Sequence, residues 1–252
     1  MWTVAETATR LVLTVTPETP VGDCELVMLQ HGLRHLPIVD ENKHPVAVVT
    51  DQRVLGLTRR DLGHIPAQSA SEPIQVLVPE TAEMKPVVEQ LLGSSQRAAI
   101  LVDGAGRLTG IFTEHDAMRL AEVALKPWLK VGDLTQSTLE LVSVPVGTEA
   151  YVARQMMLEN GVRHLLVTTQ KGRLAGVIAM RDIAGLEAST VDARMNAVVH
   201  QVSPEDDLHQ AVSVMVRHSV GSLAVVAADH TPVGVITRTD IMRAVLKQLE
   251  AE

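Results

Sequence analysis

The sequence is poor in aromatic residues and in cysteine. Phe, Trp and Tyr make up 2% of its 252 residues, although hydrophobic residues make up 46%. A core built from this chain must therefore be aliphatic, which favours buried β-strands covered by helices. Cys24 is the single cysteine, so an internal disulfide and a cysteine metal site are both excluded.

The sequence also lacks any cluster of Lys or Arg, and its formal net charge is −8. A general nucleic-acid-binding surface is therefore not expected, although a locally basic pocket can still bind an anion. No apolar run approaches the roughly 18 residues of a membrane-spanning helix. The N-terminal segment has neither the charged nor the apolar region of a signal peptide. We expect a cytoplasmic protein that binds no membrane and no nucleic-acid polymer.

Motifs of catalysis are missing as well. The chain contains no G-x-S-x-G, H-E-x-x-H, P-loop or paired-cysteine pattern. Gly104 and Gly106 fall in a predicted turn, whereas a dinucleotide fingerprint requires a strand-to-helix junction. These absences argue against an enzyme, a resident cofactor and a bound metal.

What the sequence does contain is one pattern that occurs four times. Each repeat starts with an apolar segment that ends at a proline, at Pro17, Pro79, Pro145 and Pro204. A helix-like stretch follows, and then two apolar segments flank a turn, which indicates a β-hairpin. A second helix closes the repeat. The pattern predicts an α/β fold of four β-α-β-β-α units, each of which must bury a sheet face against another unit.

The pattern also predicts the bounds of the elements. The first helices are expected at residues 23–31, 83–92, 149–160 and 206–218. The hairpin strands are expected at 35–40 with 46–50, 98–103 with 108–113, 164–169 with 174–179, and 222–229 with 232–237. Short leader segments of similar sequence precede three repeats, at 4–9, 131–136 and 191–196, whereas repeat 2 has no clean leader.

Two features indicate that the repeats form pairs. Repeats 1 and 3 carry Arg-His at the start of the first hairpin strand, and repeats 2 and 4 do not. Trp2 and Trp128 lie just before repeats 1 and 3. We therefore expect repeat 1 to pair with repeat 2 and repeat 3 with repeat 4, with repeat boundaries at 1–61, 62–126, 127–188 and 189–252.

The repeat resembles the cystathionine-β-synthase (CBS) domain over essentially the whole chain. The resemblance rests on G-L-R-H-L-P-I-V-D at 32–40, on G-V-I-T-R-T-D at 234–240, and on their counterparts in the other repeats. It implies two Bateman modules, each a pair of CBS domains, and the repeat number is similar to that of the gamma subunit of AMP-activated protein kinase. It further implies a non-catalytic regulatory protein that binds an adenosine compound: AMP, ADP, ATP, S-adenosylmethionine, NAD or a cyclic dinucleotide.

In sites of this family, a Ser/Thr-x-x-Asp motif at the start of the second helix carries recognition. Its Asp accepts hydrogen bonds from both ribose hydroxyls, and its Ser or Thr contacts phosphate. A carboxylate suits a cis-diol because it offers two acceptor oxygens, and a helix N-terminus suits a phosphate. The motif is complete in repeat 2, at Thr113 and Asp116, and in repeat 4, at Thr237 and Asp240.

The motif is incomplete in the other two repeats. Repeat 3 has Asp182 but an alanine at the hydroxyl position, and repeat 1 has Arg53 in place of the aspartate. We therefore expect the two best sites in repeats 2 and 4. The residues that the resemblance implies are the motif side chains and their neighbours (Thr113, His115, Asp116, Thr237, Arg238, Asp240 and Asp182), an adenine pocket (Val78, Ala99, Ile100, Val202, Leu223 and Ala224) and basic side chains of the paired odd repeats (Arg34, His35, Arg163 and His164).

Simpler interpretations of the same residues stay open. Asp116 and Asp240 are also what a helix dipole favours in a first turn, and the Arg-His pairs could form salt bridges or a solvated edge. The alternative to a sensor is a scaffold protein whose sites have decayed, which fits the incomplete motifs of repeats 1 and 3. For a sensor, we expect the output to be carried by a separate regulated protein or by an oligomeric change, with a homodimer the expected assembly.

Overall fold

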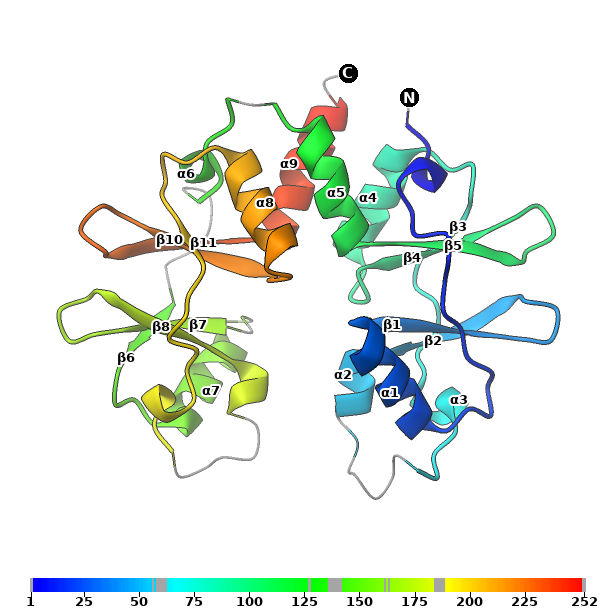
Figure 1. Cartoon of the computed structure of the whole chain (residues 1–252), viewed down its shortest axis with the longest axis horizontal. Coiled ribbons are helices and arrows are strands. Elements are labelled where there is room, and N and C mark those ends of the chain that lie inside the picture. The colour runs from blue at the N-terminus through cyan, green and yellow to red at the C-terminus, as the bar shows by residue number, and fades with distance from the viewer. Residues whose placement is uncertain are drawn as a thin grey trace. The chain divides into compact units, whose positions relative to one another are not determined.

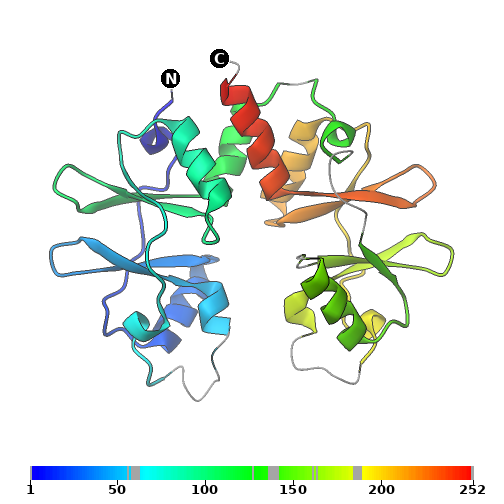
Figure 2. The same ribbon diagram turned by 180° about the vertical axis from the view of Figure 1, so that it is seen from behind.

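The computed structural model of the protein describes residues 2–55, 57, 63–126, 128–135, 142–160, 162, 164–183 and 189–250. The chain forms two compact units. Unit 1 contains the residues up to Leu120 together with those from Leu249 onward, and unit 2 contains Ala121–Gln248. Figures 1 and 2 show both units from opposite sides. Unit 1 thus holds repeat 1 and most of repeat 2, and unit 2 holds repeat 3 and most of repeat 4.

Unit 1 is built from two hairpins with helices on their outer faces. Repeat 1 consists of α1 (Val21–His31), β1 (His35–Val39), β2 (Pro45–Thr50) and α2 (Asp51–Leu55). Repeat 2 consists of β3 (Leu77–Pro79), α4 (Met84–Gly93), β4 (Ala98–Val102), β5 (Leu108–Thr113) and α5 (Glu114–Ala124). The 3₁₀ helix η1 (Val4–Glu6) and the short helix α3 (Ala67–Ala70) lie in the segments that precede the repeats.

Unit 2 repeats this plan. Repeat 3 consists of α6 (Val131–Thr135), β6 (Ser143–Pro145), α7 (Ala150–Glu159), β7 (His164–Thr168), β8 (Leu174–Ala179) and the 3₁₀ helix η2 (Met180–Asp182). Repeat 4 consists of η3 (Val191–Ala193), β9 (Gln201–Val202), α8 (Leu208–Arg217), β10 (Ser222–Val226), β11 (Pro232–Thr237) and α9 (Arg238–Glu250). No helix in the described part of the chain is both long and apolar enough to cross a membrane.

The sheets confirm the predicted α/β repeat. Three of them have three strands in which the first strand runs parallel to the second and the second pairs antiparallel with the third. In repeat 1 the first strand is reduced to a single bridge from Val15 to Ile38, so β1 and β2 form a two-stranded sheet. The first strand of repeat 1 is therefore shorter than the sequence predicts.

Helix ends follow from local chemistry. Pro20 precedes α1 with φ −59°, the value that its ring enforces. The same helix ends at Gly32, which adopts a left-handed φ of 64° that glycine tolerates without strain. Helix α8 begins at Leu208, later than predicted, because Asp207 is still extended at φ −69° and ψ 143°.

Each unit is held together by a core between its two sheets. Alternate strand residues point to opposite faces, so one set in β1 and β2 packs under α1, as Leu36 and Val49 do. The other set faces the paired repeat: Val48 of repeat 1 packs with Ile100 and Ile111 of repeat 2. Leu166, Ala224 and Val226 form the equivalent cluster in unit 2. The predicted need to bury a second sheet face is met in this way (Figure 1).

The leader segments cross from their own repeat to the paired one. Thr9 forms an antiparallel bridge with Ile111 of repeat 2, through hydrogen bonds of 2.9 and 3.0 Å. In return Glu72, just before repeat 2, bridges Val48 of repeat 1. Repeat 2 has no clean leader pattern in its sequence, but residues 65–72 take the leader's place, and they contain the short helix α3.

Unit 2 has the same exchange, and glycine makes it possible. Asn196 bridges Val177 of repeat 3, and Gly132 donates a 2.9 Å hydrogen bond to Pro204 of repeat 4. A Cβ atom on Gly176 would lie 2.6 Å from the sulfur of Met195 and 3.0 Å from the carbonyl oxygen of Asn196, so a larger residue would require the Met195 side chain and the leader backbone to shift. The glycine of the G-V-I-T pattern thus marks the crossing point of a leader.

Candidate functional site

The motif of repeat 2 spans the junction between β5 and α5. Asp116 Oδ2 accepts hydrogen bonds from the backbone N–H of Thr113 at 2.8 Å and from its hydroxyl at 2.9 Å. Asp116 Oδ1 accepts from the hydroxyl of Thr9 at 3.0 Å and from the guanidinium of Arg119. Asp116 is 1% exposed, so these four hydrogen bonds offset the burial of its charge.

The motif of repeat 4 has the same arrangement between β11 and α9. Asp240 Oδ2 accepts from the backbone N–H of Thr237 at 2.9 Å and from its hydroxyl at 2.6 Å. Arg243 donates to Oδ1 at 3.3 Å, and Arg238 at the first position of α9 is largely buried. Both complete motifs therefore present a carboxylate fixed by its own threonine.

An arginine three residues after the aspartate was missed by the sequence-based prediction. Arg119 and Arg243 occupy this position in the two repeats with complete motifs, and each bonds its aspartate. The corresponding positions in repeats 1 and 3 are Gly56 and Gly185. The signal was present in the sequence as T-x-x-D-x-x-R, which occurs in the complete motifs alone among the four.

The incomplete motifs are arranged differently. In repeat 3, Asp182 Oδ2 accepts a 3.0 Å hydrogen bond from the backbone N–H of Ala179, which has no hydroxyl to add. In repeat 1, the Arg53 guanidinium lies 3.5 Å from the Glu72 carboxylate in the leader of repeat 2. Arg53 thus pairs with a leader residue of the opposite charge, and repeat 1 has no carboxylate at this place.

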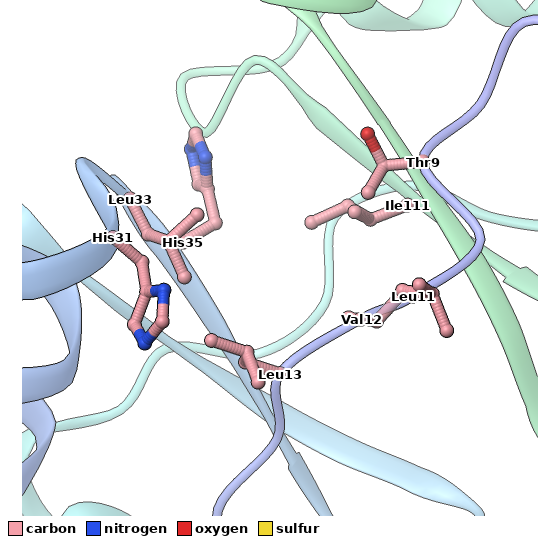
Figure 3. A pocket seen from close by; sticks show the side chains of 8 residues that line it. All are labelled: Thr9, Leu11, Val12, Leu13, His31, Leu33, His35 and Ile111. Carbon is pink, nitrogen blue, oxygen red and sulfur yellow. The ribbon is translucent and has the colours of Figure 1, made fainter.

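A cavity of about 360 Å³ lies between repeats 1 and 2 of unit 1 (Figure 3). Thr9, which donates to Asp116, is part of its wall, so the carboxylate lies directly behind that wall. In Figure 3 the side chains from α1 and β1 stand opposite those of the leader and β5. The lining is mostly apolar and consists of Thr9, Leu11, Val12, Leu13, His31, Leu33, His35 and Ile111. Such a composition is typical of small-molecule sites, whose volumes start at about 300 Å³.

His35 connects the cavity wall to the paired repeat. Its Nε2 lies 2.6 Å from the carbonyl oxygen of Gln96. Burial lowers the pKa of His35 below its ordinary value of 6.5, so the ring is neutral at pH 7. Because Nε2 faces an acceptor, it carries the proton, and Nδ1 is left as an acceptor. His35 therefore brings a hydrogen-bonding group to the cavity but no positive charge.

The other basic residues of the prediction are spread around the described structure. Arg34 is exposed, and its backbone carbonyl accepts a 3.0 Å hydrogen bond from Asp51. His115 is exposed in the first turn of α5, with its backbone N–H 3.2 Å from the hydroxyl of Thr113. His164 is exposed at the start of β7, and Arg163 lies outside the described residues.

The six residues expected around adenine are all buried. Ile100 and Ala224 belong to the clusters between paired sheets, whereas Ala99 and Leu223, one position earlier, point to the opposite sheet faces. None of the six is among the residues that line the 360 Å³ cavity: Val78, Ala99, Ile100, Val202, Leu223 and Ala224. Strand alternation thus prevents neighbouring residues from sharing one pocket through their side chains.

The equivalent wall in repeat 2 is closed by polar side chains. By their offsets from the repeat proline and the first hairpin strand, Gln75, Ser94 and Gln96 correspond to Leu13, His31 and Leu33. The Ser94 hydroxyl donates to Gln75 Oε1 at 2.8 Å, and the Gln75 backbone N–H donates to Gln96 Oε1 at 3.1 Å. Gln96 Nε2 also donates to a backbone carbonyl at 2.8 Å. This network stands where repeat 1 has a cavity wall.

Fold and site together define a protein of paired β-α-β-β-α repeats with a threonine–aspartate motif at strand–helix junctions. The family model of the CBS domain matches residues 4–60, 131–189 and 188–247. Because these ranges cover more than half of the chain, the protein belongs to the CBS-domain family.

Relatives in archaea share this architecture over the full length. Uncharacterized protein MJ1225 of Methanocaldococcus jannaschii is 22% identical over 269 aligned residues, which cover 93% of this chain and 95% of that protein. Its crystal structure, described as that of a proposed archaeal homologue of γ-AMPK, covers 96% of this chain and 99% of its own with a TM-score of 0.76. An uncharacterized conserved protein from Pyrococcus horikoshii gives a TM-score of 0.71 at 19% identity, covering 97% of this chain and 100% of its own.

Other relatives are longer than this chain. Uncharacterized protein MJ1404 of M. jannaschii is 29% identical over 187 residues, which cover 71% of this chain and 42% of that protein. The Meiotically up-regulated gene 70 protein of Schizosaccharomyces pombe is 22% identical over 262 residues, covering 99% of this chain but 35% of that protein. The repeats therefore also occur as part of larger proteins.

Proposed function

We propose that this chain is a non-catalytic regulatory sensor that binds an adenosine nucleotide against Asp116 in unit 1 and against Asp240 in unit 2. The observation that carries the proposal is the position of each carboxylate at a strand–helix junction. One oxygen is fixed by the threonine of the motif, and the other faces side-chain donors. A carboxylate so placed is an acceptor for the two hydroxyls of a ribose.

The cavity of unit 1 supports this assignment. Its apolar side chains, such as Leu33 and Ile111, suit the faces of a purine, and Thr9 connects the cavity wall to Asp116. Helix α5 starts at Glu114, so its free N–H groups and positive dipole end are available to a phosphate near Thr113. Because His35 is neutral, the helix end and the exposed Arg34 and His115 are the groups we propose to balance phosphate charge.

A role without catalysis agrees with the state of the cysteine. Burial, reinforced by the nearby charge of Asp23, raises the pKa of the Cys24 thiol to about 11. A thiol with such a pKa is protonated at neutral pH and is a poor nucleophile. We propose instead that binding of the nucleotide shifts the chain between conformations and so acts on a partner protein or on a second copy of this chain.

Titration calorimetry of the full chain with AMP, ADP, ATP, S-adenosylmethionine and NAD tests the proposal. We expect one of these compounds to bind, with about one equivalent lost in Asp116→Asn, another lost in Asp240→Asn, and all binding lost in the double variant. The 2′-deoxy form of the same ligand should bind at least tenfold more weakly, because it offers one hydroxyl to the carboxylate.

Asp51→Asn is a matched control, since Asp51 is also a first-turn residue at a strand–helix junction, in α2. It should bind like the natural protein. Full binding by the double variant, or equal affinity for the deoxy compound, would contradict the proposed site.

The scaffold alternative has support at one place. The network of Gln75, Ser94 and Gln96 fills the wall of repeat 2 that corresponds to the cavity wall of repeat 1. Arg53 is paired with Glu72, so we propose a purely structural role for the junction of repeat 1. If no adenosine compound binds in calorimetry, the same structural role extends to the whole chain.

A further inference from the structure

The ligand-binding carboxylate of Asp116 is tied to the leader of repeat 1 by two side chains. We infer that Thr9 and Arg119 form a latch that closes this site and that a bound ribose opens it. The inference rests on the proposed function, because it assigns a regulatory step to the same site. It adds that occupancy of unit 1 loosens the leader from repeat 2.

The first step of the argument is a count of acceptor positions. A carboxylate offers about four lone pairs, and Asp116 uses four: two for Thr113, one for Thr9 and one for Arg119. Two ribose hydroxyls can be accepted only when two of these donors leave. The donors on Oδ2 both belong to Thr113, which the junction of β5 and α5 fixes. The hydroxyls must therefore replace Thr9 and Arg119 on Oδ1.

The second step is that both replaceable donors hold the leader. Thr9 belongs to it, and Arg119 donates a second hydrogen bond, of 3.3 Å, to the carbonyl oxygen of Thr7. The Arg119 side chain is 49% exposed, so it can turn toward solvent or a ligand phosphate at little cost. Replacing both donors removes two side-chain links between residues 7–9 and repeat 2.

The third step limits how far the leader moves. Val4 is fully buried and its N–H donates a 2.9 Å hydrogen bond to Ala82. The carbonyl of Trp2 accepts a 2.9 Å hydrogen bond from Met84. These contacts do not involve Asp116, so the start of the leader stays in place. Ligand binding thus loosens the bridge from Thr9 to Ile111, which covers the edge of β5.

The latch is assigned to unit 1 alone. In unit 2, Arg243 bonds Asp240, but the position that corresponds to Thr9 is Gln136, which lies outside the described residues. Repeat 4 therefore supplies a comparison for the arginine but not for the leader threonine.

Amide hydrogen exchange in the ligand-free full chain tests the latch itself. Thr9→Val removes the hydroxyl but keeps the branched shape, and Arg119→Gln removes the guanidinium. Each should speed exchange of the Thr9 and Ile111 amides about threefold to tenfold, the range for loss of one net hydrogen bond. Thr109→Val is the matched control, because its buried hydroxyl has no partner among the described residues. It and Arg243→Gln should leave these amides within about twofold, and unchanged exchange in both latch variants would overturn the latch.

Binding of AMP in an Asp240→Asn background, where only unit 1 can respond, tests the coupling. The leader amides should exchange faster in the AMP complex than in the free chain, and Thr9→Val should bind AMP about threefold to tenfold more tightly. Binding by the latch variants alone would also support the inference. AMP binding with unchanged or slower exchange at Thr9 and Ile111 would overturn the coupling and leave the proposed function intact. If these chains bind none of AMP, ADP, ATP, S-adenosylmethionine and NAD, the proposed function and the coupling are both overturned.

Discussion

In unit 1 the junction of repeat 2 carries Asp116, which Thr9 links to a cavity wall, whereas the junction of repeat 1 carries Arg53, which pairs with Glu72. The two junctions share their backbone plan, and each faces the leader of the other repeat. Thr9 bridges Ile111, which lies two residues before Thr113. Glu72 bridges Val48, which lies two residues before Thr50. The residue pairs that differ are therefore Asp116 with Thr9 and Arg53 with Glu72.

The comparison shows that the motif residue and the leader residue vary together. Where the motif carries a buried carboxylate, the leader supplies a hydroxyl donor at 3.0 Å. Where the motif carries a guanidinium, the leader supplies a carboxylate at 3.5 Å, and both side chains are partly exposed. A diol needs an acceptor, and at the second junction that acceptor belongs to Glu72, which Arg53 already engages. In the proposed function, ligand capacity thus depends on two residues from different repeats.

The largest expected difference concerns stability at the two junctions. Asp116→Asn replaces one acceptor oxygen with an N–H₂ group, which then faces donors and cannot accept their hydrogen bonds. We therefore expect a loss of about 2–4 kcal/mol in the free energy of unfolding. Arg53→Ala removes a partly exposed ion pair and should cost less than about 0.5 kcal/mol. Urea denaturation of both variants measures the difference. Equal losses would mean that the two junctions do not differ as described.

The next largest effect on stability compares the cavity wall of repeat 1 with the polar network of repeat 2, by giving each the residue that the other has at the corresponding position. Gln96→Leu leaves the backbone N–H of Gln75 and the carbonyl of Pro73 without partners, so it should cost about 1–3 kcal/mol. Leu33→Gln puts a polar side chain on a cavity wall that water can reach, and should cost about 1 kcal/mol or less. Thermal unfolding of both variants tests this order. A larger loss in Leu33→Gln would show that the cavity wall is packed as tightly as the network.

Much of the fold could be predicted from the sequence because its signals are local. Hairpins such as 98–113 follow from two apolar runs around a polar turn, and the structure has its second strand, β5, at the predicted residues 108–113. The crossing of the leaders left no such signal, since it depends on contacts between residues far apart in the chain. The glycines that permit the crossing, Gly110 and Gly176, were visible, but a glycine in a strand has several possible causes.

The candidate site, which stays a prediction for every residue assigned to it, could be located from the sequence only in part. Register among the repeats identified Asp116 and Asp240 and separated them from Arg53. Thr9 could not be found in this way, because it lies 107 residues from Asp116 in the chain. The six adenine-pocket residues were implied by the family resemblance, and strand alternation sends the side chains of neighbours such as Ala99 and Ile100 to opposite faces. Their role stays a prediction, as do the roles of Arg34, His164 and Arg163.

A smaller effect on stability is expected from His35, which links the cavity wall of repeat 1 to Gln96 of repeat 2. Burial lowers the pKa of His35 in the folded chain below 6.5, so protons bind the unfolded chain more readily. Stability from the neutral ring is therefore fully present above pH 6.5 and is lost as the pH falls through the folded pKa. His35→Gln should remove this part of the pH dependence. Denaturation between pH 5 and 8 measures it, and identical slopes in both proteins would contradict the assignment.

The smallest effect should come from His44, and its sign is opposite. Its Nδ1 lies 3.0 Å from Asp40 Oδ2 and its Nε2 lies 3.2 Å from the carbonyl of Ala105, so it joins the hairpin turns of repeats 1 and 2. Both partners are acceptors, which favours the doubly protonated ring, and the hydrogen bond to Asp40 raises the pKa of His44 above 6.5.

The stability that His44 contributes is thus present below pH 6.5 and is lost as the pH rises through the folded pKa. His44→Gln should flatten the profile above pH 6.5, where His35→Gln has no effect. Comparing the two variants in one pH series separates a contact at the cavity wall from one at the hairpin turns. Because the ring is exposed, the effect of His44 should be smaller than that of His35. A change of the same sign in both variants would show that the two histidines do not act as independent links between repeats 1 and 2.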